Sequence, residues 1–463
     1  MLHTKTPIIE EWIGEALQKA HHLGEPLFIS IVEQIDNQDP FQFFDAGKDI
    51  DQHRTFWQSA DSDFTIVGVG KASQLYAKST HRFQEVQSLW NQLQENAMVH
   101  DEYNIKGTGM VAIGGFSFDP EQQDQSPWGS FLDTQMTVPA YLMTQVNGES
   151  YLTINALIFP EDHLQQISNQ VLSHREMLLR QQDSTTHLPS IKEAYEIAPN
   201  DWKNSVKQAT EDIKAGLIEK VVLARELRVS FEEDAHIASI LKTLADTQQN
   251  SYIFAYESDG DYFVGATPER LAKLEERELV STCLAGTIPR GRTEEEDQLF
   301  GQELMNDPKN RQEHQFVVEM IREAVEACSS HVSIPEAPVL YPLKNLQHLY
   351  TPVRAKLDEG YTLLDVIEKL HPTPALGGMP QKESVEYIRI HETLNRGWYA
   401  GPIGWFDAGN NGEFAVAIRS ALIQKDEASL FAGCGVVEDS DPEAEYEETS
   451  VKLKPMLSVL GGS

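Results

Sequence analysis

The chain has 463 residues, and its 72 acidic residues outnumber its 37 lysines and arginines, so the formal net charge is −35. A surface so acidic repels phosphate backbones and anionic lipid heads, which argues against nucleic-acid or membrane partners. The sequence shows no signal-peptide pattern and no apolar run near the ~18 residues that span a bilayer, so we expect a cytoplasmic protein. Its 40% of hydrophobic residues predict a substantial core. The three cysteines lie far apart and offer neither a disulfide framework nor a zinc pattern.

The N-terminal half alternates short strand-like runs with helical ones. The runs FTIVGVG, MVAIGGFSF and YLTINALIF are rich in β-branched and aromatic residues, whereas HRFQEVQSLWNQLQ has a helical period. This mixture, without strict strand–helix alternation, predicts an α+β fold dominated by antiparallel strands. The turn-rich segment FDPEQQDQSPWGSF (residues 118–131) indicates a surface loop or hairpin, and a polar stretch near 180–200 indicates a boundary.

One helix of the C-terminal half is expected to begin at Asp307, because an aspartate N-cap followed by a proline, here Pro308, is a favoured helix start. Its apolar stripe runs through Val317 and Ile321, and one turn before that stripe lies Glu313. We therefore expect Glu313 on the inward face, near the N-terminal end of this helix.

A second helix is expected to begin in the same way, at Asp441 and Pro442. Glu445 lies one turn before Glu448 on this helix, and Lys452 lies one turn after it. Besides Glu448, the expected inward stripe contains Ala444, Val451 and Pro455.

Two inward carboxylates require a partner, because a buried carboxylate must be protonated, paired with a cation or bound to a metal. A converging pair would suit Mg²⁺, which takes one or two protein carboxylates and completes its octahedron with water and substrate oxygens. The alternative stays open that each glutamate lies at the edge of its stripe, where it is solvated or paired with lysine or arginine.

Arg419 is a candidate anion-binding residue. If FAVAIRSALI is one continuous strand, Arg419 shares a face with Ala415, Ala417 and Ala421, and small neighbours leave room for a ligand. The planar guanidinium matches a carboxylate with two parallel hydrogen bonds. An arginine that reaches solvent from an edge strand is the alternative.

Lys220, at the start of a strand with apolar neighbours, is a candidate base, and Glu269 lies in a turn between two strands. Most residues in such places are ordinary surface charges. Gly433 and Gly435, in AGCG, allow the backbone to approach an anion closely. His371 is a single histidine without metal-ligand spacing, which more often indicates a structural role.

The C-terminal half resembles the chorismate-utilising enzymes, a family that includes isochorismate synthases, salicylate synthases and the large subunits of anthranilate and aminodeoxychorismate synthases. The resemblance covers most of residues 200–460 in the family's order, and less sharply the N-terminal segments GGFSF, WGSF and VPAYLM, which are similar to menaquinone-type isochorismate synthases. The segments that carry it are KAGLIEKVVLAR, FVGATPERL, LAGTIPRG, KNRQEHQFVVEMI, LHPTPALGG, WYAGPIGW, FAVAIRSALI and FAGCGVVEDSDPEAEYEETSVKLKPML.

The resemblance implies an α+β fold in which two antiparallel sheets pack as a sandwich, with helices outside and the active site in a cleft. It implies one folded unit, composed of an N-terminal α+β region (1–195) and a chorismate-binding catalytic region (196–463).

The resemblance also implies roles for individual residues. Glu313 and Glu448 would bind Mg²⁺ with Glu445 nearby, and Arg419 and Tyr399 would hold a substrate carboxylate. The rest of the substrate site would be lined by Thr287, His371, Lys452, Gly433 and Gly435.

The family divides at the position of Lys220, where members that add water have lysine and those that use ammonia usually have glutamine. The resemblance therefore implies an isomerase that converts chorismate to isochorismate, with menaquinone biosynthesis as the expected pathway. Lys220 would activate a water that attacks ring carbon C2, and protonated Glu269 would give a proton to the departing C4 hydroxyl. Mg²⁺ would bind the ring carboxylate, no glutamine amidotransferase subunit is expected, and the enzyme would be a monomer or homodimer.

Three alternatives remain at this point. A salicylate synthase, which makes isochorismate and then eliminates pyruvate, would share Lys220, Glu269 and the metal-binding pair Glu313 and Glu448. Anthranilate synthase component I is disfavoured by Lys220. A non-catalytic regulator that binds Mg²⁺ or chorismate would be expected to have lost Lys220 or Glu269, and both are present.

Overall fold

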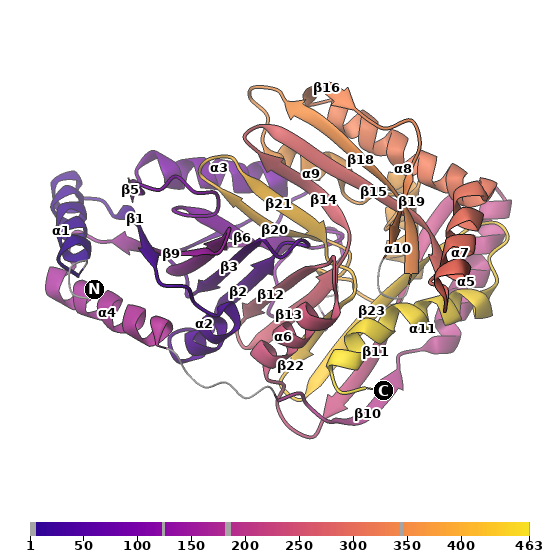
Figure 1. Ribbon diagram of the computed structural model, residues 1–463, viewed down its shortest axis with the longest axis horizontal. Helices are drawn as coiled ribbons and strands as arrows, with labels where there is room; N and C mark the ends of the chain where they lie inside the picture. The colour runs from indigo at the N-terminus through magenta and orange to yellow at the C-terminus, as the bar shows by residue number, and fades with distance from the viewer. Residues whose placement is uncertain (1–5, 123–125, 181–186, 343–345, 463) are drawn as a thin grey trace.

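The computed structural model describes residues 6–122, 126–180, 187–342 and 346–462. Two large sheets face each other, and helices cover their outer sides (Figure 1). Within the described residues, all neighbouring strands pair antiparallel except β1 and β5, which are parallel. Each sheet combines strands from the N-terminal and C-terminal halves of the chain.

The larger sheet contains 13 strands within the described residues. In spatial order these are β10 (Ile191–Glu196), β11 (Lys220–Phe231), β23 (Glu427–Val436), β22 (Ser420–Gln424), β13 (Asp261–Thr267), β12 (Tyr252–Ser258), β2 (Arg54–Gln58), β3 (Phe64–Val69), β8 (Tyr141–Val146), β9 (Glu149–Ile158), β1 (Leu27–Ile35) and β5 (Met98–His100), with β19 (Gly378–Met379) paired to β11.

The smaller sheet contains 10 strands in the part of the chain that is described. Their spatial order is β16 (Ser329–Ser333), β18 (Leu346–Leu357), β15 (Glu278–Pro289), β14 (Arg270–Glu275), β21 (Gly412–Val416), β20 (Pro402–Asp407), β6 (Val111–Phe116), β7 (Thr134–Val138) and β4 (Ser73–Tyr76), with β17 (Val339–Pro342) paired to β18.

The helices pack against the strands that adjoin them in space: α1, α2 and α6 contact the larger sheet, while α8 and α9 contact the smaller one. Among the described helices, none has both the length and the apolar character that a membrane crossing requires. Their bounds are α1 (Thr6–Leu23), α2 (Pro40–Ala46), the 3₁₀ helix η1 (Gly47–Asp49), α3 (Arg82–Glu95), α4 (Leu164–Leu179), α5 (Pro199–Lys214), α6 (Ile237–Thr247), α7 (Glu294–Asn306), α8 (Pro308–Glu326), α9 (Leu363–Leu370), α10 (Gln381–His391) and α11 (Pro442–Val459).

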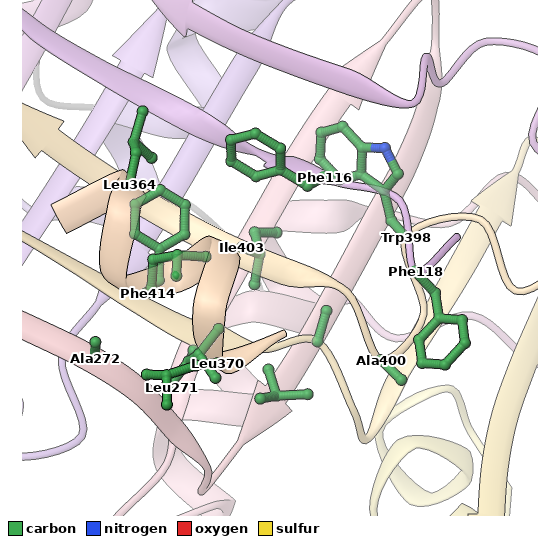
Figure 2. Close-up of a cluster of buried hydrophobic side chains, with 14 of the residues drawn as sticks. Phe116, Phe118, Leu271, Ala272, Leu364, Leu370, Trp398, Ala400, Ile403 and Phe414 are labelled. Carbon is green, nitrogen blue, oxygen red and sulfur yellow. The ribbon is translucent and has the colours of Figure 1, made fainter. Parts of the chain in front are cut away.

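Aromatic side chains fill the core between the sheets. Trp405 of β20 stacks on Phe64 of β3, with ring centroids 4.8 Å apart, and so joins the two layers. On the other face of the smaller sheet, Phe116 packs on Phe83 of α3, and Phe414 lies near Leu364 of α9 (Figure 2). A separate apolar cluster, which includes residues of α1, α4 and α6, covers the larger sheet. Burial of apolar surface in these layers is the main stabilising term of the fold.

The chain crosses directly from one sheet to the other at two neighbouring points. Between β13 and β14 the crossing consists of Pro268 and Glu269, and between β21 and β22 it consists of residues 417–419. Arg419, with a φ of 51°, has the left-handed backbone conformation. The prediction that FAVAIRSALI is a single alternating strand is therefore wrong, because the run leaves the smaller sheet at Val416 and enters the larger one at Ser420.

Backbone hydrogen bonds hold the two crossings together. The amide of Val416 donates to the carbonyl of Glu269 over 3.0 Å, and the amide of Ala266 donates to the carbonyl of Arg419 over 3.1 Å. Glu269 and Arg419, which lie far apart in the sequence, are thereby fixed beside each other.

Candidate active site

A cavity of about 310 Å³ opens beside the two crossings. Its wall is built from β11, β15 and β23, from the N-terminal turns of α8 and α11, and from the crossings themselves. The structure brings together all but one of the residues that the sequence placed in the site: Lys220, Glu269, Thr287, Glu313, Tyr399, Arg419, Gly433, Gly435, Glu445, Glu448 and Lys452.

Glu269 is a buried carboxylic acid in the wall of this cavity. Burial raises the pKa of its carboxyl group from the ordinary 4.5 to about 7, although the positive charges of Arg419, Lys452 and Lys220 act in the opposite direction. Its carboxyl group has no hydrogen-bond partner within the described residues. Glu269 can therefore hold a proton near neutral pH and give it to a ligand.

Lys220 is the first residue of β11, as the sequence predicted. Its backbone carbonyl accepts a hydrogen bond of 2.9 Å from the Ser384 hydroxyl, and its ammonium group forms an ion pair with Glu313. The side chain passes Gly435 so closely that a Cβ atom there would lie 2.9 Å from the Lys220 Cε atom. Gly435 thus provides the space in which the amine reaches the cavity.

Arg419 and Tyr399 form the part of the wall suited to an anion. The Arg419 guanidinium has no hydrogen bond or ion pair to any described residue, and burial lowers its pKa to about 10 while the Glu269 charge opposes that change. Burial also raises the pKa of the Tyr399 hydroxyl, which therefore stays protonated and can donate a hydrogen bond. Next to them, the Lys452 amine donates to the Gly433 carbonyl over 2.9 Å.

His348 belongs to the cavity wall but was not predicted. Its Nδ1 atom lies 2.9 Å from the Thr287 hydroxyl, across the β15–β18 pair. Burial, together with the charges of Arg419 and Lys452, lowers the pKa of His348 to about 3, so the imidazole is neutral. In the sequence His348 is one residue of an ordinary alternating strand, which gives no signal of this role.

The two helices begin where the sequence predicted, with Asp307 as N-cap of α8 and Asp441 as N-cap of α11. Glu313 and Glu448 lie at the edges of the buried faces of α8 and α11, with side chains 39% and 53% exposed. Glu448 forms an ion pair with Lys452 over 2.7 Å. Pairing with lysine, one of the alternatives that the sequence left open, is therefore the arrangement observed for both glutamates.

The predicted inward stripe of α11 is wrong. Ala444 and Val451 are exposed, and Pro455 is only half-buried. The buried face is rotated from the predicted one, because Thr449 packs inward with the apolar side chains of the second half of the helix. That buried face consists of Thr449, Leu453, Met456 and Val459.

The carboxylates of α8 and α11 fit a magnesium ion by their chemistry. In the part of the chain that the structure describes, no three His, Cys, Asp or Glu side chains by themselves form a metal-binding group. Glu313, Glu445 and Glu448 nevertheless line one cavity, and the pKa of Glu445 is raised by burial and also by the charge of Glu448. A divalent cation would offset both effects, and hard oxygen donors are the ligands that Mg²⁺ prefers.

His371 was expected on the wall, but it is not among the described residues that line the cavity. Its Nε2 atom instead donates a hydrogen bond of 2.9 Å to the carbonyl of Phe118, and its ring packs edge-on against the Phe118 ring. Burial lowers the pKa of His371 to about 3. The ring therefore supports the N-terminal segment from behind the wall, because its Nε2 atom is hydrogen bonded to Phe118.

Comparison with known proteins identifies the family of the chain. Residues 15–461 match the family described as chorismate binding enzyme. The chain is a chorismate-binding enzyme.

This chorismate-binding enzyme is 44% identical to isochorismate synthase MenF of Bacillus subtilis, over 100% of its own length and 99% of that protein. It is 35% identical to the salicylate biosynthesis isochorismate synthase of Pseudomonas aeruginosa, over 100% of its length and 96% of that protein. The solved structure of MenF, the menaquinone-specific isochorismate synthase from Escherichia coli, matches it with a TM-score of 0.79 at 25% identity, covering 96% of this chain and 100% of that one. The α+β two-sheet fold implied by the resemblance is confirmed.

Proposed function

We propose that this chorismate-binding enzyme is an isochorismate synthase, which converts chorismate to isochorismate for menaquinone biosynthesis. One observation carries the proposal: the cavity places an amine, Lys220, and a carboxyl group with a pKa of about 7, Glu269, beside the guanidinium of Arg419, which is not paired with any described residue. Addition of water with loss of a hydroxyl group requires a base, an acid and an anchor for the substrate anion. The names of the two curated relatives support the same reaction.

In the proposed reaction, the Lys220 amine, unprotonated and released from its ion pair with Glu313, takes a proton from water as the water oxygen forms a bond to C2 of the ring. The ring double bonds shift, the C4–O bond breaks, and the leaving hydroxyl takes the proton of Glu269 and departs as water. One proton is taken and one is given, so no oxidant or reductant is needed. Exchange with solvent then returns both groups to their starting protonation.

The remaining residues bind and orient the substrate. Arg419 and Tyr399 would hold a substrate carboxylate by charge-assisted hydrogen bonds. Glu313, Glu445 and Glu448 are the residues that would hold Mg²⁺, which neutralises and orients a substrate carboxylate when it is bound. The net charge of −35 makes such neutralisation valuable for an anionic substrate.

The described cavity-lining residues lie between Lys220 and Lys452 in the sequence. This placement supports assigning catalysis to residues 196–463, with residues 1–195 as the N-terminal region of the same folded unit. A lysine at position 220 supports water as the nucleophile, without a glutamine amidotransferase subunit. The cytoplasmic location and the monomeric or homodimeric state stay predictions.

The test is to incubate the purified protein with chorismate and Mg²⁺, with and without EDTA, and to separate the products by chromatography. We expect isochorismate alone, with formation lost in EDTA. Salicylate and pyruvate would show a salicylate synthase, anthranilate formed from added ammonia would show an anthranilate synthase, and no turnover would refute the proposal. Lys220→Met should abolish turnover, whereas Lys242→Met on α6 should not, since Lys242 does not line the cavity.

A further inference from the structure

We infer that the buried ion pair of Glu392 and Arg396 is a positioning element of the active site, which fixes Tyr399 and two neighbouring walls of the cavity. The inference deepens the proposed function and rests on it. The pair lies between α10 and β20, and neither residue has a role in the proposed chemistry.

The pair is fully enclosed by protein. The Glu392 side chain is 2% exposed and that of Arg396 is 3% exposed. The Nε and Nη2 atoms of Arg396 each donate to one oxygen of Glu392 over 2.7 Å, which is the two-pronged geometry that only a guanidinium provides. A buried pair persists only when its remaining hydrogen-bonding groups also find partners.

Those remaining groups reach two walls of the cavity. The Arg396 Nη1 atom donates to the carbonyl of Leu376 over 3.0 Å, and Nη2 donates to the carbonyl of Val222 over 2.7 Å. Glu392 accepts a hydrogen bond of 2.7 Å from the Ala224 amide. Leu376 and Val222 both line the cavity, and Val222 is two residues beyond Lys220 on β11. The pair therefore joins the strand of the proposed base to the segment that contains Leu376.

Arg396 itself lines the cavity, yet its hydrogen atoms are committed to the protein. Four of its five N–H groups donate to Glu392, Val222 and Leu376. Arg419, by contrast, has no partner among the described residues. Arg419 is therefore the arginine available to a substrate anion, and Arg396 acts through the groups that it holds.

Besides the two cavity walls, Arg396 also holds Tyr399. Its amide donates to the carbonyl of Arg396 over 2.8 Å, so the two residues share one turn. Burial of the ring against Phe431, with centroids 5.3 Å apart, leaves the hydroxyl directed past the backbone of Gly433. A shift of Arg396 would consequently move the Tyr399 hydroxyl.

The N-terminal half supports the same turn. The Phe118 amide donates to the Gly397 carbonyl over 2.6 Å, and the Arg396 guanidinium lies 4.3 Å from the centroid of the Phe118 ring. The indole nitrogen of Trp128 donates to the carbonyl of Asn395 over 3.0 Å. Figure 2 shows Phe118 beside Ala400, at the end of the aromatic cluster that includes Trp398.

The sequence predicted residues 118–131 as a surface loop or hairpin. For the two ends of this segment the prediction is wrong, because Phe118, Trp128 and Phe131 are 3%, 2% and 5% exposed and belong to the main core. Residues 123–125 lie outside the described residues. Their burial places an N-terminal segment directly behind the Arg396 turn. Part of the active-site support therefore comes from residues 1–195.

The decisive experiment is a double-mutant cycle of Arg396→Lys and Tyr399→Phe, measured as kcat and KM for isochorismate formation. Lysine keeps the charge but loses the two-pronged pairing, so kcat/KM should fall about 100-fold, as for a misplacement of about 1 Å. In the Tyr399→Phe background, Arg396→Lys should lower kcat/KM about tenfold or less, because the Tyr399 hydroxyl that Arg396 positions is already absent. Equal losses in both backgrounds would overturn the inference.

Arg54→Lys is the matched control. Arg54 and Glu257 form another enclosed pair, 6% and 2% exposed, between β2 and β12 and away from the cavity. Both lysine variants should lower the unfolding temperature, but only Arg396→Lys should lower kcat/KM. Equal kinetic losses in the two variants would show a general effect of destabilisation and overturn the positioning role.

A measurement without substrate separates this inference from the proposed function. Amide hydrogen exchange of Ala224 and Tyr399 should be faster in Arg396→Lys than in wild type, and unchanged in Arg54→Lys. If wild type makes no isochorismate, the proposed function fails and exchange alone decides the inference. If Arg396→Lys does not fold, Glu392→Gln, which keeps the shape of the pair, takes its place with the same expected pattern; unchanged exchange would overturn the inference.

Discussion

Glu269→Gln tests whether a group needed for catalysis weakens the fold. Burial raises the pKa of this carboxyl group from 4.5 to about 7, so the chain takes up a proton when it folds at intermediate pH. Burial of Glu269 therefore costs no stability below about pH 4.5. The cost grows as pH rises toward 7 and is constant above pH 7. The accumulated cost above pH 7 is about 3 kcal/mol.

Glutamine has nearly the same shape as protonated glutamate and carries no proton to lose. Since no described residue hydrogen bonds to the Glu269 carboxyl group, the substitution removes no hydrogen bond to a described residue. We expect Glu269→Gln to abolish isochorismate formation and to raise the free energy of unfolding by about 3 kcal/mol at pH 8.5, but by less than about 1 kcal/mol at pH 5.

Urea unfolding of wild type and variant at these two pH values measures the difference, provided that the slope of free energy against urea is unchanged. Glu25→Gln, at an exposed position after α1, serves as the control and should show no pH-dependent difference. A Glu269→Gln variant with equal effects at both pH values would refute the argument that burial holds a proton on this residue.

Three further outcomes are expected. Gly435→Ala should lower kcat by about 100-fold with a nearly unchanged unfolding temperature, because the new Cβ would lie 2.9 Å from the flexible end of Lys220; full activity in steady-state kinetics would contradict it. Arg419→Gln should raise KM at least tenfold, since a charged anchor without other partners is lost, and calorimetric chorismate binding equal to wild type would remove Arg419 from the substrate site. In wild type, kcat/KM should fall above about pH 7 as Glu269 loses its proton, and this falling limb in a pH–rate profile should be missing if another group is the acid.

The sequence was sufficient to predict those parts of the site whose position depends only on neighbouring residues in the chain. The N-caps Asp307 and Asp441 were predictable because an aspartate followed by a proline specifies a helix start from neighbouring residues alone. The inward face of α11 was not, since Thr449 is polar in the sequence but buried, and Val451 is apolar but 40% exposed. Which face a helix buries depends on what packs against it.

The sheet crossings could not be predicted from alternation. FAVAIRSALI has the period of one strand throughout, and nothing within it indicates that its two ends join different sheets. Likewise Arg396 and Trp128 acquire their roles from partners more than 150 residues away, at Val222 and Asn395. The family resemblance supplied the fold and most of the site because it carries long-range information that a single periodic pattern lacks.

The paired crossings also determine which distances in the site respond to motion. Glu269 and Arg419 both lie on segments shared by the two sheets, and their backbones are hydrogen bonded to Val416 and Ala266. A sliding movement of one sheet over the other would carry the two residues together and leave their separation unchanged. Lys220 belongs to the larger sheet alone, so the same movement would change its distance from Glu313, on the helix that covers the smaller sheet. Shear between the layers would thus move the proposed base, Lys220, relative to Glu269 and Arg419, whose separation stays unchanged.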